Sequence, residues 1–216
     1  MVNKHHEVLD PLEVDVSAPR AGHVIEDAAD AARRIMDSLL RTGRNNPHLE
    51  QIRDQLHAIA DTLDEYSSGI DACLVEMWAG DGTNRHDPVS GTENPIAPPF
   101  LFRGRSDGSI RGEATLGLPY QGPPGMVHGG VAALVLDHAL GCANGYAGTS
   151  GMTGWLKVRY HRTTPLFEPL VVTARQTSVE GRKIHTVGEI AAADGGVCVS
   201  AEGLFIAGQL DRPRSL

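Results

Sequence analysis

The segment from Met126 to Asp137 constrains this chain most, because it joins a glycine turn to a long apolar run that contains one acid. The loop over residues 122–125, with two glycines and two prolines, precedes it and is incompatible with regular secondary structure. The apolar run is too long for a strand and contains few β-branched residues. It therefore predicts a central, buried helix over about residues 129–146.

Two features of this predicted helix, its first turn and its single acid, point to catalysis. Gly129 and Gly130 follow His128 in its first turn, where backbone N–H groups are free and the helix dipole is positive. Asp137 lies in apolar surroundings, where a carboxylate is costly unless something pairs with it or uses it. Oxyanion donors and a buried acid on one helix together favour a reaction at a carbonyl group.

The chain after residue 98 predicts an antiparallel sheet around this helix. A strand is expected near 110–118, and four strand-like runs follow the helix, at 153–161, 169–178, 183–192 and 197–207. Short connections with Pro or Gly separate these four runs, which makes neighbouring strands antiparallel. We therefore predict an α+β fold for residues 98–216, with the sheet wrapped around the central helix.

Residues 1–97 predict a helical extension and a linker. Residues 1–22 resemble a loose tail, two amphipathic helices are expected within 23–66, and the proline-rich stretch 80–99 predicts the linker. The second helix has an apolar stripe at Leu49, Ile52, Leu56, Ile59 and Leu63. Such stripes need a partner surface, either each other or the rest of the protein.

Composition excludes several classes of function. The net charge of −8 and the pI near 5.6 argue against nucleic-acid binding and against a polybasic membrane role. No apolar run approaches the roughly 18 residues of a membrane span, and the acidic N-terminal region does not resemble a targeting peptide. Cys73, Cys142 and Cys198 are scattered at apolar positions, which predicts free thiols in a reducing, cytoplasmic setting.

The ten histidines do not indicate a metal centre, because no His/Cys/Asp group has an established metal-ligand spacing. The pair His5-His6 lies in the predicted tail. The sequence also has neither a Gly-rich phosphate loop nor a Gly-x-Ser-x-Gly elbow. We predict no metal and no cofactor.

Four sequence motifs resemble those of a known protein family and occur in the same order. They are residues 125–130, the acid at Asp137, the strand from Met152-Thr153 to Arg162, and the hairpin at 179–183. With these motifs, residues 98–208 resemble the hotdog-fold acyl-CoA thioesterases, nearest the PaaI-like and Them-type branch. The resemblance implies a hotdog fold, hydrolysis of an acyl-CoA thioester, and at least a homodimer; a tetramer or hexamer is equally compatible.

The resemblance also implies roles for five residues at the reaction centre. Asp137 would be the nucleophile or the general base. The backbone N–H of Gly129, with that of Gly130 as a neighbouring candidate, would bind the thioester oxygen. His128 would polarise the carbonyl or hold the loop, and the hydroxyl of Thr153 would help to orient the acid or a water.

Helix geometry fits the implied dimer. Eight residues separate Gly129 from Asp137, which places them about 12 Å apart along the axis. One thioester carbonyl cannot contact both within one chain. The resemblance implies a two-fold dimer, in which the helix start of one protomer faces the acid of the other.

In the strand 153–161, alternation places Thr153, Trp155, Lys157, Arg159 and His161 on one side, with Leu156, Val158 and Tyr160 toward the helix. Five basic residues are candidates for binding the phosphates of coenzyme A: Lys157, Arg159, Arg162, Arg182 and Lys183. His138, beside the acid, is expected to pack or bond locally.

Three alternatives stay open. A ligand-sensing transcription regulator needs a basic N-terminal region, but residues 23–66 contain five Arg and nine Asp or Glu, which gives 5 − 9 = −4. A hotdog hydratase or dehydratase would use a different acid/base pairing. A non-catalytic acyl-CoA-binding protein would bind the thioester without turnover.

Overall fold

The computed structural model describes residues 14–17, 20–71, 84–98 and 100–208. Its helices are α1 (Val24–Arg41), α2 (Leu49–Glu65), the short 3-10 helix η1 (Leu118–Tyr120) and α4 (Gly129–Tyr146). Its strands are β1 (Val14–Asp15), β2 (Leu101–Gly104), β3 (Ile110–Thr115), β4 (Met152–Tyr160), β5 (Pro169–Glu180), β6 (Lys183–Ala192) and β7 (Val197–Ile206).

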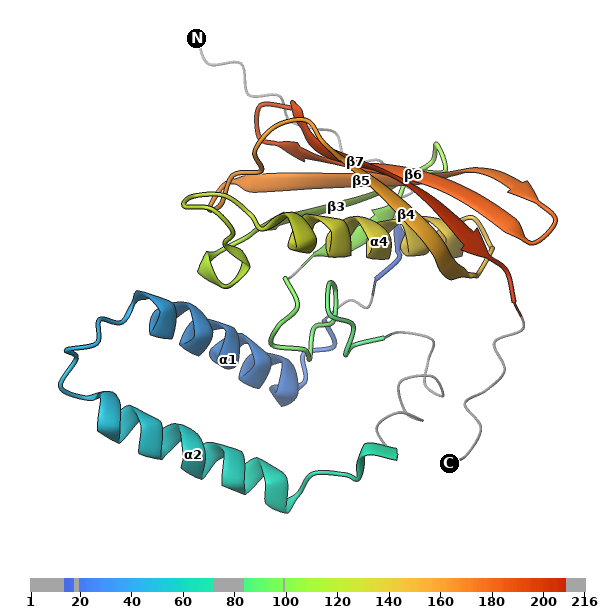
Figure 1. The fold of residues 1–216 in the computed structure, drawn as a ribbon. Coiled ribbons are helices and arrows are strands. Elements are labelled where there is room, and N and C mark those ends of the chain that lie inside the picture. The colour runs from blue at the N-terminus through green and yellow to red at the C-terminus, as the bar shows by residue number, and fades with distance from the viewer. Residues whose placement is uncertain (1–13, 18–19, 72–83, 99, 209–216) are drawn as a thin grey trace, which may run out of the picture.

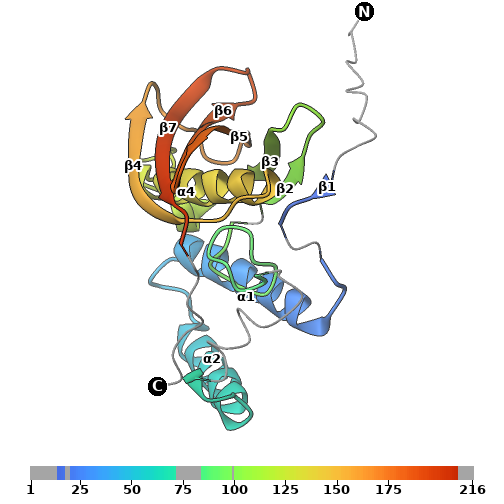
Figure 2. The same ribbon diagram turned by 90° about the vertical axis from the view of Figure 1, so that its right-hand side faces the viewer.

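The described strands form one antiparallel sheet in the order β1-β2-β3-β5-β6-β7-β4. The sheet curls around α4, as Figures 1 and 2 show. This confirms the predicted α+β hotdog arrangement, and the central helix begins and ends at the residues that the sequence predicts. The sequence did not predict β1 and β2, which are too short for an alternation pattern to be legible.

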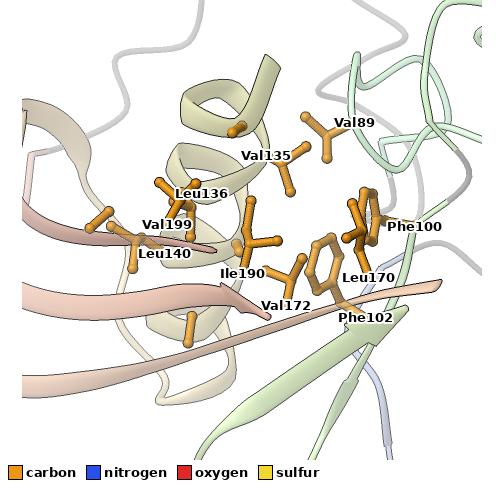
Figure 3. Packing of buried hydrophobic residues seen from close by; sticks show 14 of the residues in the cluster. Val89, Phe100, Phe102, Val135, Leu136, Leu140, Leu170, Val172, Ile190 and Val199 are labelled. Atoms are coloured by element: carbon orange, nitrogen blue, oxygen red, sulfur yellow. The ribbon is translucent and has the colours of Figure 1, made fainter. Parts of the chain in front are cut away.

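The core lies between α4 and the concave face of the sheet (Figure 3). Leu136 and Leu140 of α4 are fully buried against side chains such as Val172, Ile190 and Val199. Two strand glycines permit this close approach. A Cβ atom at Gly188 or Gly203 would lie 3.0 Å or 2.8 Å from a methyl carbon of Leu140.

The first N-terminal helix lies on the side of α4 away from the sheet, and α2 lies beyond it (Figure 1). Glu26 forms a capping box with His23, and its carboxylate accepts the N–H groups of Ala21, Gly22 and His23. These bonds lower the pKa of Glu26, against the opposing effect of burial. The cap therefore fixes where α1 begins.

Two predictions for the N-terminal part need correction. Residues 14–17 belong to the sheet, because β1 pairs with β2 and Ser17 Oγ accepts the N–H of Phe102. The stretch 84–98 packs into the core through residues such as Val89. Arg33 of α1 holds this stretch by donating to four of its backbone carbonyls. Proline and glycine correctly excluded helix and strand there, but they do not determine burial. Residues 1–13 and Cys73 lie outside the described residues.

Within the described ranges, no helix is both long and apolar enough to cross a membrane.

Candidate active site

The start of α4 is held by its own capping residue. His128 is the N-cap, and its Nδ1 accepts the backbone N–H of Gly130 at 3.0 Å. The preceding loop reverses through Gly125, at a φ of 76°, which favours glycine. This loop is closed by a backbone bond from Gly122 N–H to the carbonyl of Met126 at 2.9 Å. The exposed imidazole of His128 therefore already uses one of the free donors of the first turn.

Tyr160 of β4 contacts the same turn from the other side. Its hydroxyl donates to the carbonyl of Gly129 at 2.9 Å, and a Cβ atom at Gly129 would lie 3.3 Å from its ring. The peptide between Gly129 and Gly130 is thus bonded at both ends, by Tyr160 and by His128. The N–H of Gly129 has no acceptor among the described residues and remains available at the positive end of the helix. The alternation of β4 predicts that Tyr160 points toward the helix, but it does not reveal this hydrogen bond.

Asp137 lies two turns further along α4 and is partly exposed in the single chain. The sequence predicted a buried carboxylate, so this prediction is wrong for one chain alone. Its Oδ1 accepts the hydroxyl of Thr153 at 3.0 Å. The acid and Thr153 are therefore brought together within one protomer, whereas Gly129 lies about 12 Å away along the axis.

A β-bulge explains how Thr153 reaches the acid. The register between β4 and β7 shifts between Thr153 and Trp155, so Gly154 is an extra residue in the strand. An extra residue reverses the alternation of side chains. Thr153 therefore shares the helix-facing side with Leu156, and its predicted placement beside Trp155, Lys157 and Arg159 is wrong.

An open groove of about 330 Å³ lies beside the start of α4. Met126, Val127, Ala132 and Tyr160 supply much of its apolar lining, and Gly129 is part of its wall. The groove therefore combines an apolar surface with the free N–H of the helix start.

The five basic candidates do not form one cluster. Lys157 and Arg159 lie on β4, Arg162 follows its end, and Arg182 and Lys183 lie at the β5–β6 hairpin. Lys157 Nζ lies 3.5 Å from Glu202, and Arg182 Nε donates to the carbonyl of Ala207 at 2.7 Å. Arg159 and Lys183 are exposed.

The guanidinium of Arg162 already binds other groups of the protein. Its guanidinium forms a bidentate ion pair with Asp194 and also donates to the carbonyl of Gly196 at 2.6 Å. The ion pair lowers the pKa of Asp194 and raises that of Arg162. With these donors engaged, Arg162 fixes the β6–β7 turn and is a weak candidate for phosphate binding.

A second polar cluster lies behind the acid, on another face of α4. His138 Nδ1 is 3.2 Å from Asp87 Oδ2, and its Nε2 is 2.9 Å from Ser90 Oγ and 3.3 Å from Cys142 Sγ. The sequence predicts only a local contact for His138. Asp87 and Ser90 could not be found from it, because they are about fifty residues away in the chain.

This cluster has the order of a Ser-His-Asp triad, but its chemistry does not fit one. Burial alone would lower the pKa of His138, yet the bonds to Asp87 and Cys142 raise it to about 10. The imidazole is therefore protonated at neutral pH and is no base, and Ser90 is only 5% exposed. We assign the cluster a structural role that fixes the 84–98 stretch to α4.

In the part of the chain that the structure describes, no group of three or more His, Cys, Asp or Glu side chains is placed to hold a metal ion.

Comparison with protein families gives two matches. Residues 124–199 match the thioesterase superfamily. Residues 16–72 match a family described as the N-terminal helical domain of the hypothetical protein RHA1_ro05818. The first match contains α4, β4, β5 and β6, and the second contains α1 and α2.

Individual proteins give closer comparisons. Protein RHA08564, described as a thioesterase superfamily protein, has a crystal structure that superimposes on this chain with a TM-score of 0.83. The two sequences are 54% identical, and the match covers 90% of this chain and 96% of that one. The acyl-coenzyme A thioesterase THEM4 of Bos taurus is 38% identical over 101 residues, and that of Xenopus laevis is 34% identical over 90 residues. These matches cover 46% and 41% of this chain, but only 40% of each relative's length.

Proposed function

Since the chain belongs to the thioesterase superfamily, we propose that it hydrolyses acyl-CoA thioesters to a free acid and CoA. The observation that carries this proposal is the arrangement on α4. Gly129 offers a free N–H for a developing oxyanion, and two turns further along the helix Asp137 accepts the hydroxyl of Thr153. The reaction needs only water as co-substrate, so we propose no cofactor.

In this mechanism the thioester carbonyl oxygen accepts the N–H of Gly129. Asp137 of the partner subunit then acts in one of two ways: it removes a proton from a water that attacks the carbonyl carbon, or it attacks that carbon itself and forms a mixed anhydride that water hydrolyses to the free acid. In both routes the C–S bond breaks and CoA leaves as the thiolate, which takes up a proton from solvent. Thr153 orients the carboxylate by its hydrogen bond. His128 acts through the helix cap, because its Nδ1 already bonds the N–H of Gly130.

We further propose that the reaction centre forms between two protomers. The separation of about 12 Å between Gly129 and Asp137 is too long for one carbonyl group to contact both. β4 supports this proposal because it is an edge strand of the described sheet, and Met152, Trp155 and Tyr160 on it are 67%, 43% and 55% exposed. Unpaired edges of this kind readily join another chain.

For the CoA phosphates we propose Arg159 and Lys183 as two separate candidates, because Lys157 pairs with Glu202, Arg162 pairs with Asp194, and Arg182 binds a backbone carbonyl. Both are exposed, and within the described residues neither forms a side-chain hydrogen bond or an ion pair.

A thiol-release assay tests the proposed reaction. We expect free CoA thiol to accumulate when the protein is incubated with a panel of short-chain, medium-chain, long-chain and phenylacetyl-CoA. Hydration of an enoyl-CoA, or binding without turnover, releases no thiol. Absence of release across the panel, with acyl-CoA bound or hydrated instead, would contradict the proposal and favour one of the alternatives.

Tyr160→Phe tests the support of the helix start. We expect kcat to fall by roughly 2- to 10-fold, the range for a hydrogen bond of about 0.5–1.5 kcal/mol, with little change in KM. The melting temperature should change little, because the substitution keeps the aromatic ring and removes only the hydroxyl that bonds Gly129. Tyr66→Phe, at an 80% exposed tyrosine after α2, is the matched control. An equal effect of both substitutions would remove Tyr160 from the proposed mechanism.

A further inference from the structure

In the single chain, the described residues leave the apolar stripe of α2 only partly covered. It consists of Leu49, Ile52, Leu56, Ile59, Leu63 and, directly after the helix, Tyr66. The exposed fraction rises along it, to 54% at Ile59, 65% at Leu63 and 80% at Tyr66. None of the residues of α2 is buried.

Such a helix needs a covering surface. An isolated helix of this length is marginally stable in water, and its stability in a protein comes mainly from burial of its apolar face. Figure 1 shows α2 as the outermost layer, beyond α1. The open groove between the two helices, about 340 Å³ in volume, extends the apolar surface to Ile35 and Leu39.

We propose that α2 pairs antiparallel with α2 of a second copy of this chain. Its apolar positions are separated by 3, 4, 3, 4 and 3 residues, which is the heptad pattern of paired helices. This pattern is unchanged when it is read backwards. Leu49 of one copy therefore comes opposite Tyr66 of the other, Ile52 opposite Leu63, and Leu56 opposite Ile59.

The charges on α2 fit a second copy. The positions that flank the stripe contain no acid: they are Arg53, Gln55, Ala60 and Thr62. In the antiparallel register, Arg53 of one copy comes within about 3 Å along the axis of Asp64 of the other, on the same side. Among the residues that the structure describes, Arg53 pairs with the neighbouring, exposed Asp54 and with no other acid. That surface pair is weak and easily exchanged.

The charge of α2 disfavours a lipid membrane as the surface that covers the stripe. Residues 49–65 contain five acids and one arginine, so the net charge of the helix is 1 − 5 = −4 with histidine neutral. Interfacial helices instead have a polar face rich in lysine and arginine, which is attracted to anionic lipids.

Cross-linking through one cysteine added to α2 tests the pairing, and the protein with only its three native cysteines gives the background. Residue 56 of the two copies is separated by about 4.5 Å along the axis in the antiparallel register, whereas residue 49 is separated by about 25 Å. We expect a short bismaleimide to convert Leu56→Cys into a covalent dimer and to leave Leu49→Cys at the background of the unmodified protein. Both changes replace a leucine of the same stripe. Mass spectrometry of the linked peptide identifies the cysteines involved.

A second pair of variants tests whether the cross-link depends on the apolar stripe. Ile59→Glu added to Leu56→Cys should abolish the cross-link, and Ala58→Glu, which places the same charge on the opposite face, should leave it. Linking of both cysteine variants would indicate parallel helices, and linking of neither would show that no second copy covers the stripe. Either result overturns the proposal. The pairing does not depend on the proposed reaction, because thiol release from acyl-CoA tests that reaction separately.

Discussion

Asp137→Asn is expected to lower kcat for acyl-CoA hydrolysis by about 10²- to 10⁴-fold, the range for loss of a positioned base. The amide has the same shape as the carboxylate but can neither attack a carbonyl carbon nor accept a proton. The fold should be unaffected, because Asp137 is partly exposed and the amide oxygen can still accept the hydroxyl of Thr153. Thiol release gives kcat, and circular dichroism with the melting temperature reports the fold.

The matched control is Glu202→Gln on β7, which also removes one carboxylate but lies on the outer face of the sheet near Lys157. It should leave kcat unchanged. Near-normal turnover of Asp137→Asn would remove this acid from the mechanism, and the thioesterase proposal would then need another base.

Asp87→Asn is expected to have the largest effect on stability. Asp87 and His138 form an ion pair whose side chains are only 16% and 19% exposed. Removal of one partner leaves a buried charge without compensation, at a cost of about 3 kcal/mol in the free energy of unfolding at pH 7. Urea denaturation of the two proteins measures this loss. Asp194→Asn, which breaks the exposed pair with Arg162, is the control and should have a much smaller effect.

The same ion pair predicts how stability changes with pH. The pKa of His138 is about 10 in the folded chain and near 6.5 when unfolded. The imidazole therefore binds its proton more tightly in the folded state, and this stabilisation is fully present below about pH 6.5. The free energy of unfolding should fall as the pH rises from there to about 10. In Asp87→Asn the slope should be flatter, and an equally steep slope in both proteins would contradict the assignment.

Sequence patterns were sufficient for the elements with long, regular periodicity. The apolar run after the glycine turn predicted α4, and alternation with short turns predicted β4 to β7 at nearly their observed bounds. These features are local, because burial of one helix or of one strand face leaves its period in the sequence. The family resemblance rested on residues in the same local segments.

Other features follow only from contacts between distant segments. The bulge at Gly154 moves the side chain of Thr153 to the helix-facing side of β4, and the alternation of residues in β4 does not predict this bulge. Asp87 and Ser90 reach His138 across about fifty residues of chain, and β1 is too short to be recognised without its partner β2. In each case a partner that is remote in sequence supplies the hydrogen bond or pairing.

The central helix, the main strands of the sheet and the place of Asp137 on that helix could be predicted from the amino-acid sequence, because each leaves a periodic or chemical pattern within a few turns of chain. The free N–H of Gly129, the contact between Thr153 and the acid, and the ion pair of Arg162 with Asp194 became visible only in three dimensions. Hydrogen bonds and ion pairs depend on distances of about 3 Å between atoms, and a one-dimensional pattern does not contain these distances.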